Sequence, residues 1–185
     1  MKKTLLLILI LMVSVISTAC INNLAVQELN NKAKEYMDKG DYQNAIGRFK
    51  SSIDLDSTIF ETHYNLGIAY TQAEEYADAI DAFEDALKIN PDYALAYYSI
   101  AVAYENAAKD IINPPKKDDD DDDDDDLIDD TKKELSVEQK SEIVDLFTKS
   151  IDSYQTYLEK EPNSDRKEEV SNKIEYLQKE VEKYS

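Results

Sequence analysis

The chain has 185 residues, of which 42% are hydrophobic, and its formal net charge is −19 at pH 7. This length suits one ordinary domain, and the charge excludes nonspecific binding to nucleic acid, because phosphate groups would be repelled. Only 3 glycines and no tryptophan are present, which argues against a turn-rich β fold and favours an all-α protein.

The amino terminus contains two lysines, a largely apolar run over residues 5–16 and small residues before Cys20, the single cysteine. A run of this length is typical of a signal peptide and is short for a membrane span, which needs roughly 20 apolar residues. The STAC sequence that ends at Cys20 resembles the lipobox of bacterial lipoproteins, although Ser17 departs from the usual leucine-like residue. The resemblance implies a signal peptide over residues 1–19, a lipidated (palmitate-type) Cys20, and a tether over residues 20–25.

The alternative is an uncleaved signal anchor in which Cys20 occurs by chance. Both interpretations place the rest of the chain outside the cytoplasm, at a membrane of the bacterial cell envelope, and leave open which membrane and leaflet. Each buried CH₂ of an acyl chain contributes roughly 0.8 kcal/mol, so an acylated Cys20 would hold the protein on a lipid bilayer almost permanently. We therefore expect a following domain that needs no lipid-binding face of its own.

A repeat begins near residue 26, because a shift of 34 residues superposes tyrosines, small residues and apolar residues. The tyrosines are Tyr36, Tyr70 and Tyr104, and the small residues are Ala33, Gly67 and Ala101. Further along, Ala45, Phe49 and Ile53 match Ala79, Phe83 and Leu87, and the members of each set are four residues apart. Such spacing predicts two amphipathic helices in each repeat.

The stretch HYNLGIAYTQAEEYADAIDAFEDALKINPD resembles a tetratricopeptide repeat (TPR), a 34-residue helix-turn-helix unit. His63 stands where the family prefers a large aromatic residue. The residues that carry the family signature are Leu66, Gly67 and Tyr70 in the first helix and Ala79, Phe83, Ala86 and Pro91 in the second. The resemblance implies one unit over residues 60–93 and a looser one over residues 26–59, where Lys32 and Ser57 depart from the pattern.

A third unit starts at Ala94, but its second helix is delayed. The pattern of Ala79, Ile80, Phe83, Leu87 and Pro91 returns at Ser150, Ile151, Tyr154, Leu158 and Pro162, displaced by 71 residues instead of 34. The third unit therefore spans residues 94–163 and contains an acidic insertion at about residues 111–135. We expect this insertion to be a disordered loop, because the nine aspartates Asp118–Asp126 repel one another within a Debye length of about 8 Å.

Two helices are expected after the insertion. Ser136 and Gln139 have the spacing of a capping box, which predicts a helix that starts near Val137. Residues 164–185 contain an apolar stripe, which predicts a capping helix with a polar outer face. The expected fold is thus a right-handed α-solenoid of about three TPR hairpins, the third interrupted by the acidic insertion, followed by the capping helix.

The resemblance implies a function in protein-protein interaction. In this family the first helices line a concave groove that binds peptides. The positions that the family uses in this groove, called the first-helix positions below, are Asn30, Lys34, Tyr64, Asn65, Ile68, Thr71, Gln72, Tyr98, Val102, Glu105 and Asn106. The alternative for the tyrosines is that they pack against the lengthened helices of the third unit.

The partner is expected to be a neutral or basic peptide or protein, because the chain is acidic. One TPR type binds a C-terminal carboxylate through basic side chains, but Leu95 and Ser99 occupy the third-unit positions that would need them, so we do not predict that clamp. Three repeats are near the minimum for a self-sufficient solenoid, which leaves a homodimer open.

The alternative function is cation binding or basic-partner binding through Asp118–Asp126. A defined calcium site needs six to eight oxygens held in place, and the run lacks the glycine turn and glutamate that usually do so, so only weak divalent cation association is expected. No metal site, cofactor or enzyme activity is predicted, because His63 is the single histidine and stands at a packing position. Protein binding at a membrane, without catalysis, is the function that the sequence favours.

Overall fold

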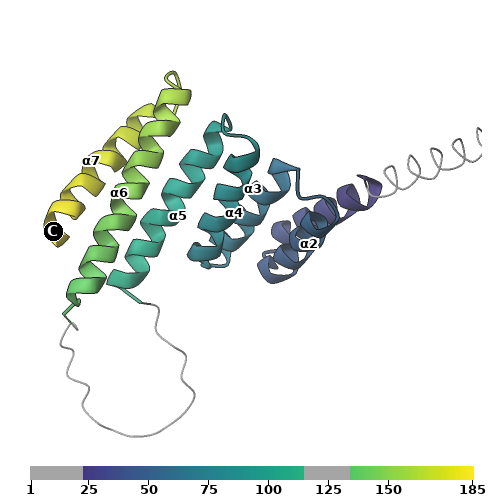
Figure 1. The fold of residues 1–185 in the computed structure, drawn as a ribbon, viewed down its shortest axis with the longest axis horizontal. Helices are drawn as coiled ribbons and strands as arrows, with labels where there is room; N and C mark the ends of the chain where they lie inside the picture. Colours follow the sequence, from purple (N-terminus) through teal and green to yellow (C-terminus); the bar gives the residue numbers. More distant parts are fainter. Residues whose placement is uncertain (1–22, 115–133) are drawn as a thin grey trace, which may run out of the picture. The chain divides into compact units, whose positions relative to one another are not determined.

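The computed structural model describes residues 23–114 and 134–185, and within these ranges it contains helices and no strands (Figure 1). A helix over residues 23–38 comes first, and the order then is α2 (Tyr42–Leu55), α3 (Phe60–Gln72), α4 (Tyr76–Ile89), α5 (Ala94–Ile112), α6 (Val137–Lys160) and α7 (Lys167–Tyr184). The all-α prediction is confirmed. Cys20 and Asp118–Asp126 lie outside the described residues, so the structure leaves the predictions for them as predictions.

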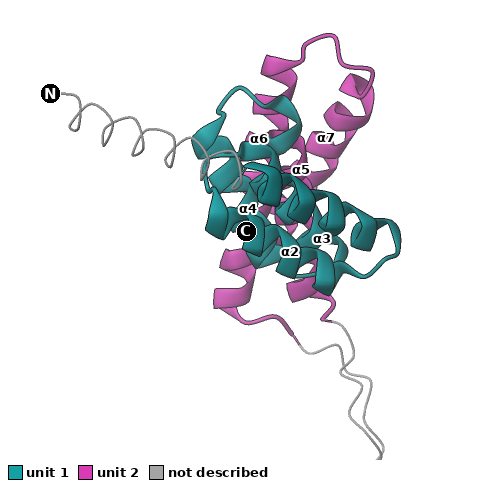
Figure 2. Cartoon of the chain, turned by 90° about the vertical axis from the view of Figure 1, so that its right-hand side faces the viewer, with its two compact units in different colours: residues 1–96 teal, residues 97–185 magenta. Residues whose placement is uncertain are grey.

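The chain divides into two compact units, residues 1–96 and residues 97–185 (Figure 2). In unit 1 the helix over residues 23–38 is followed by α2, and α3 is followed by α4, each pair joined by a short turn. Within each turn one residue has a left-handed backbone: Gly40 with φ 72° and, one repeat later, Glu74 with φ 62°. The turns also share a hydrogen bond, from Asp41 N to Tyr36 O and from Glu75 N to Tyr70 O, at 2.9 Å in both.

The core of unit 1 repeats with the same interval as the sequence. Phe49 of α2 and Phe83 of α4 are 1% and 0% exposed, and an alanine four residues before each is also fully buried. Small residues bring the helices close together, and a Cβ added at Gly67 of α3 would lie 2.6 Å from ring carbons of Phe83. Close packing in this core therefore depends on having glycine at this position.

Unit 2 packs α6 against both α5 and α7. The hydroxyl of Ser150 donates to the Ala101 carbonyl at 2.8 Å, and both residues are completely buried. Val170 and Leu177, from the predicted stripe of α7, are fully buried as well. The capping box at the start of α6 is confirmed, because Ser136 Oγ accepts from Gln139 N and Gln139 Oε1 accepts from Ser136 N.

Two helix boundaries differ from the sequence-based expectation. Residues 23–25, expected in the tether, are helical, and the next residue, Val26, is only 3% exposed. Val26 lies on the same helical face as the buried Ala33. Burial of this valine explains why the helix extends so far toward the amino terminus. At the other boundary α5 continues through Ile112, where the acidic loop was expected to have begun, and both Ile111 and Ile112 are half-buried.

Candidate functional site

The first-helix positions of unit 1 lie on the helix over residues 23–38 and on α3. These two helices are joined where the Asn30 side-chain amide donates to the Thr62 hydroxyl at 2.9 Å, and Thr62 is fully buried. The amide oxygen of Asn30 is buried and has no hydrogen-bond partner among the described residues. Asn30 therefore connects the two repeats, and its side-chain amide is used mainly for that contact.

Tyr64 belongs to an aromatic cluster of the second repeat. Its ring centroid lies 5.0 Å from that of Tyr93 and 5.6 Å from that of Phe83, and Phe60 lies 5.0 Å from Tyr93. Burial raises the pKa of Tyr93, and the nearby Tyr64 and Glu61 raise it further. Tyr64 is half-buried, so part of its ring packs within the repeat and part of it is accessible.

The remaining first-helix positions of unit 1 are more accessible than its core. Lys34 and Gln72 are exposed, and Asn65, Ile68 and Thr71 are half-buried. The Thr71 hydroxyl donates to the Gly67 carbonyl of its own helix at 2.8 Å. Tyr64 and Ile68 are one helical turn apart on α3, so an aromatic and an aliphatic side chain lie next to each other on one face.

Tyr98 in unit 2 is packed as the alternative interpretation of the tyrosines describes. Its ring lies 5.6 Å from Tyr154 and 5.5 Å from Tyr157 of α6, and the Arg166 guanidinium lies over it at 4.7 Å. Its hydroxyl donates to Glu169 at 3.1 Å. Burial, followed by the hydrogen bond and charge of Glu169, raises the pKa of Tyr98. Tyr98 is half-buried like Tyr64, but both its ring and its hydroxyl already have partners inside unit 2.

Glu105 is at the centre of a buried ionic cluster in unit 2. The carboxylate is 4% exposed and accepts hydrogen bonds from Lys109 at 2.5 Å, Lys173 at 3.0 Å and the Tyr154 hydroxyl at 3.2 Å. Burial by itself would raise the pKa of Glu105, but the hydrogen bonds and charges of the two lysines outweigh burial and lower this pKa. Its oxygens are thus used inside the unit, whereas the neighbouring first-helix positions Val102 and Asn106 are half-buried.

The sequence-based reasoning missed the contribution of α7. Tyr98 and Glu105 of α5 contact Glu169 and Lys173 of α7 in the same order along both helices, so the two helices run in the same direction. The apolar stripe of α7 predicted a capping helix but gave no indication of which polar residues would meet α5. Those contacts join residues 71 and 68 positions apart in the sequence.

His63 has a structural role in unit 1. It is 7% exposed, and its Nε2 lies 3.0 Å from the Ser57 carbonyl, to which it donates. Within the described ranges no group of three or more His, Cys, Asp or Glu side chains is arranged to hold a metal ion. The helices of those same ranges also include none with the length and apolarity of a membrane span.

Comparison with known proteins identifies the repeats. A tetratricopeptide-repeat family model matches residues 60–93, and a second one, for the TPR repeat, matches residues 33–73. No curated protein sequence matches the chain.

Several solved TPR domains have a similar fold. The first TPR domain of Spaghetti (RPAP3), bound to the HSP90 peptide SRMEEVD, has a TM-score of 0.59 at 18% identity and covers 84% of this chain and 92% of that chain. The second TPR domain of human RPAP3, in complex with the HSP70 peptide SGPTIEEVD, has a TM-score of 0.60 at 13% identity, with 85% and 98% covered. The TPR2B domain of yeast Sti1, in complex with pHsp70, has a TM-score of 0.59 at 14% identity, with 84% and 98% covered.

These identities are low, so the three structures establish similarity of fold. The family matches add the repeat signature over the first two repeats, within residues 33–93. Residues 33–93 therefore contain matched tetratricopeptide repeats, and the described helices have the fold of solved TPR domains.

Proposed function

We propose that this protein is a lipid-anchored, extracytoplasmic interaction module that binds a peptide or protein segment on its first-helix positions. The observation that carries the proposal is the set of accessible side chains on α3 and the preceding first helix in a chain with matched TPR repeats. Structurally similar domains of RPAP3 were solved with peptides and one of Sti1 in complex with pHsp70, which supports a binding function for this fold.

Binding is proposed to centre on unit 1. Tyr98 and Glu105 already have partners inside unit 2, so they contribute packing more than recognition. In unit 1, Ile68 and Tyr64 provide apolar surface, and Asn65 and Gln72 provide hydrogen-bonding groups for an extended backbone. Side chains of these two kinds, close together on one helix face, suit a peptide in extended conformation.

The proposed partner is neutral or basic. The peptides solved with the two RPAP3 domains end in EEVD, which is acidic. The present chain has a net charge of −19, and Leu95 and Ser99 stand where basic side chains would be needed to hold such a terminus. We therefore expect an EEVD peptide to bind weakly or not at all.

The test is capture of partners by cross-linking from native envelopes, with Ile68→Ser compared with the wild type. Ile68 is chosen as the target, and Tyr98 is not, because Tyr98 is packed in unit 2 and its loss would disturb folding. Ile89→Ser is the matched control, since this isoleucine is 39% exposed at the end of α4, away from the first-helix positions.

A partner captured by the wild type and the Ile89→Ser variant, but not by Ile68→Ser, would support the proposal, provided that circular dichroism shows equal folding. A partner that Ile68→Ser still captures at the wild-type level would contradict it. The partner identified would also be tested for binding to the purified chain, because capture alone includes indirect neighbours.

A further inference from the structure

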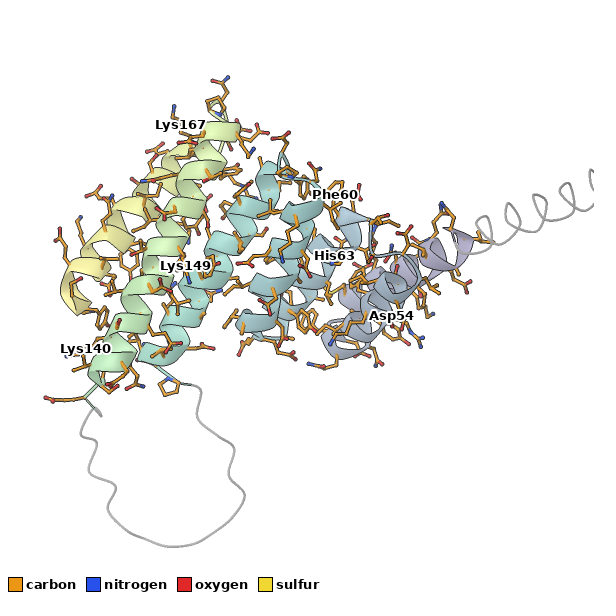
Figure 3. The ribbon with its side chains drawn as sticks, viewed as in Figure 1. Asp54, Phe60, His63, Lys140, Lys149 and Lys167 are labelled. Carbon is orange, nitrogen blue, oxygen red and sulfur yellow. The ribbon has the colours of Figure 1, made fainter. Side chains whose placement is uncertain are left out.

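A concave surface lies in unit 1, among α2, α3 and α4. This cleft of about 530 Å³ is separate from the first-helix positions. His63, Leu66 and Tyr70 of α3 line it, whereas Tyr64 and Ile68 lie on the other side of the same helix. Figure 3 labels His63 on α3 and Asp54 on α2, on two of the three helices that border the cleft.

The floor of the cleft is apolar. Leu66, Tyr70 and Ala82 line it and are each 5% to 6% exposed, and Ile53 of α2 is half-buried beside them. Side chains this deeply packed cannot move far, so the floor is a fixed surface. An occupant with aliphatic groups would gain from covering it, because burial of apolar surface is favourable.

The rim of the cleft is acidic on both sides. Asp78, Asp81 and Asp85 lie three and four residues apart on α4 and therefore share one face, and Asp54 comes from α2. Asp85 pairs with Lys88 at 2.8 Å. Neither Asp54 nor Asp81 forms an ion pair with any other described residue.

Lys50 is the one lysine or arginine among the lining residues, and it shows how a cation fits. Its ammonium lies 5.5 Å from the centre of the Tyr70 ring, so a cation is already placed over the aromatic part of the floor. The aspartates form no group that could hold a metal ion within the described ranges. The spacing of the charges thus suits an extended organic cation better than a single small ion.

We propose that this cleft binds a basic segment of a partner protein, in which lysine or arginine side chains alternate with apolar ones. The apolar side chains and aliphatic stems cover the floor formed by Ile53, Leu66 and Ala82, and the cationic ends reach Asp54 and Asp81. This surface is formed mainly by second helices, so it can be occupied while a peptide is bound at the first-helix positions. The protein would then connect two partners.

The test uses fluorescence polarisation with the full chain in detergent and a labelled short peptide of alternating leucine and arginine. The double variant Asp54→Asn with Asp81→Asn removes two charges and preserves side-chain shape. We expect its Kd to rise roughly tenfold, because two partly exposed ion pairs are lost. Binding by the wild type is also expected to weaken with added salt.

Two control variants separate this cleft from general electrostatic attraction. The double variant Asp152→Asn with Asp165→Asn changes the net charge equally at exposed positions of unit 2 and is expected to bind within about twofold of the wild type. A variant in which Asp118–Asp126 are all changed to serine is likewise expected to keep most of the binding. A peptide of alternating serine and arginine is expected to bind less tightly, because it cannot cover the apolar floor.

Unchanged affinity of the Asp54→Asn, Asp81→Asn variant would overturn the proposal, provided that circular dichroism shows it to be folded. An equal loss of affinity in the Asp152→Asn, Asp165→Asn variant would also overturn the proposal, since the attraction would then come from the overall charge. If only the Asp118–Asp126 variant lost affinity for the peptide, basic-partner binding would be assigned to the aspartate run instead. Equal affinity for the leucine and serine peptides would exclude the apolar floor from the site.

Discussion

Gly67 is the residue at which the sequence pattern and the packing are most directly connected. A methyl group added there would lie 2.6 Å from the Phe83 ring, which is fully buried and cannot easily move. We expect Gly67→Ala to lower the free energy of unfolding by about 1–3 kcal/mol, because an overpacked core must shift its side chains. Urea unfolding followed by circular dichroism measures this change.

Gly47 is the matched control for this substitution. It lies on α2, is exposed, and a Cβ there would meet nothing within 4 Å. Gly47→Ala should raise the free energy of unfolding by about 0.5–1 kcal/mol, because alanine has less conformational entropy to lose in a helix. If both glycines responded alike, contact with Phe83 would not explain the glycine in the repeat signature.

Glu105 is expected to stabilise unit 2 in a pH-dependent way. Glu105→Gln should lower the free energy of unfolding at pH 7 by on the order of 2 kcal/mol, because a buried carboxylate with two lysine partners is lost. Its pKa is lowered in the folded chain, so this stabilisation is complete above the ordinary pKa of about 4.3 and is lost as the pH falls through the lowered value.

The measurement is urea unfolding of both proteins at about pH 7 and about pH 3. The difference between the wild type and Glu105→Gln should be large at the higher pH and should shrink at the lower one. Glu175→Gln is the control, since Glu175 forms an exposed pair with Lys179, and it should leave the free energy of unfolding unchanged. A difference that is the same at both pH values would mean that the charge of Glu105 has no part in stability.

At the scale of elements, the turns inside the first two repeats share one backbone conformation but differ in sequence. Gly40 adopts its left-handed φ without strain, whereas Glu74 adopts nearly the same φ with a side chain. We expect Glu74→Gly to raise the free energy of unfolding by about 0.5–1 kcal/mol, because relief of strain exceeds the extra entropy of the unfolded glycine. Thermal unfolding measures the gain.

The reciprocal change provides the comparison. Gly40→Ala puts a Cβ on a residue with φ 72° and should lower the free energy of unfolding by about 1 kcal/mol. The two substitutions should change the free energy of unfolding in opposite directions only if the left-handed turn conformation is strained for residues with a side chain. A stabilising effect of Gly40→Ala would show that this conformation is not strained for other residues.

The helices after the insertion show which elements are predictable. The capping box at Ser136 and Gln139 is a local signal, and it correctly predicted the start of α6. The tether was a weaker inference, since the burial of Val26 that extends the first helix depends on contacts with other helices. Local hydrogen bonds are thus readable from short spacings, whereas helix ends that depend on packing are not.

At the scale of the whole molecule, the proposed anchoring depends on Cys20, which lies outside the described residues. Cys20→Ser is expected to abolish acylation and to move the protein from the membrane fraction to the soluble fraction, because the acyl chains supply the attachment. Metabolic labelling with an acyl-chain analogue, followed by fractionation, measures both effects. Thr18→Ser is the control, because it keeps a small residue before the cysteine.

Membrane retention of the Cys20→Ser protein would contradict the lipoprotein interpretation and would favour the signal anchor. That outcome would leave the helical repeats and their proposed partners unaffected. The anchor and the binding surfaces are therefore tested independently of each other.

The 34-residue period by itself predicted repeated pairs of amphipathic helices, and the TPR resemblance of its second repeat agrees with the family matches over residues 33–93. Periodic spacing is enough because each helix must bury one face, and the face recurs with the helical turn. Gly67 and Phe83 could be read from spacing for the same reason, and the capping box could be read because its two hydrogen bonds are local.

Only the tertiary structure decided what the polar and aromatic side chains do. Tyr98 and Glu105 occupy family groove positions, yet Tyr154, Glu169 and Lys173 use them inside unit 2. The cleft between Asp54 and Asp81 likewise appears only when α2 and α4 are placed beside α3. These contacts join residues far apart in the chain, and they depend on how helices approach one another, which a spacing pattern along one helix does not contain.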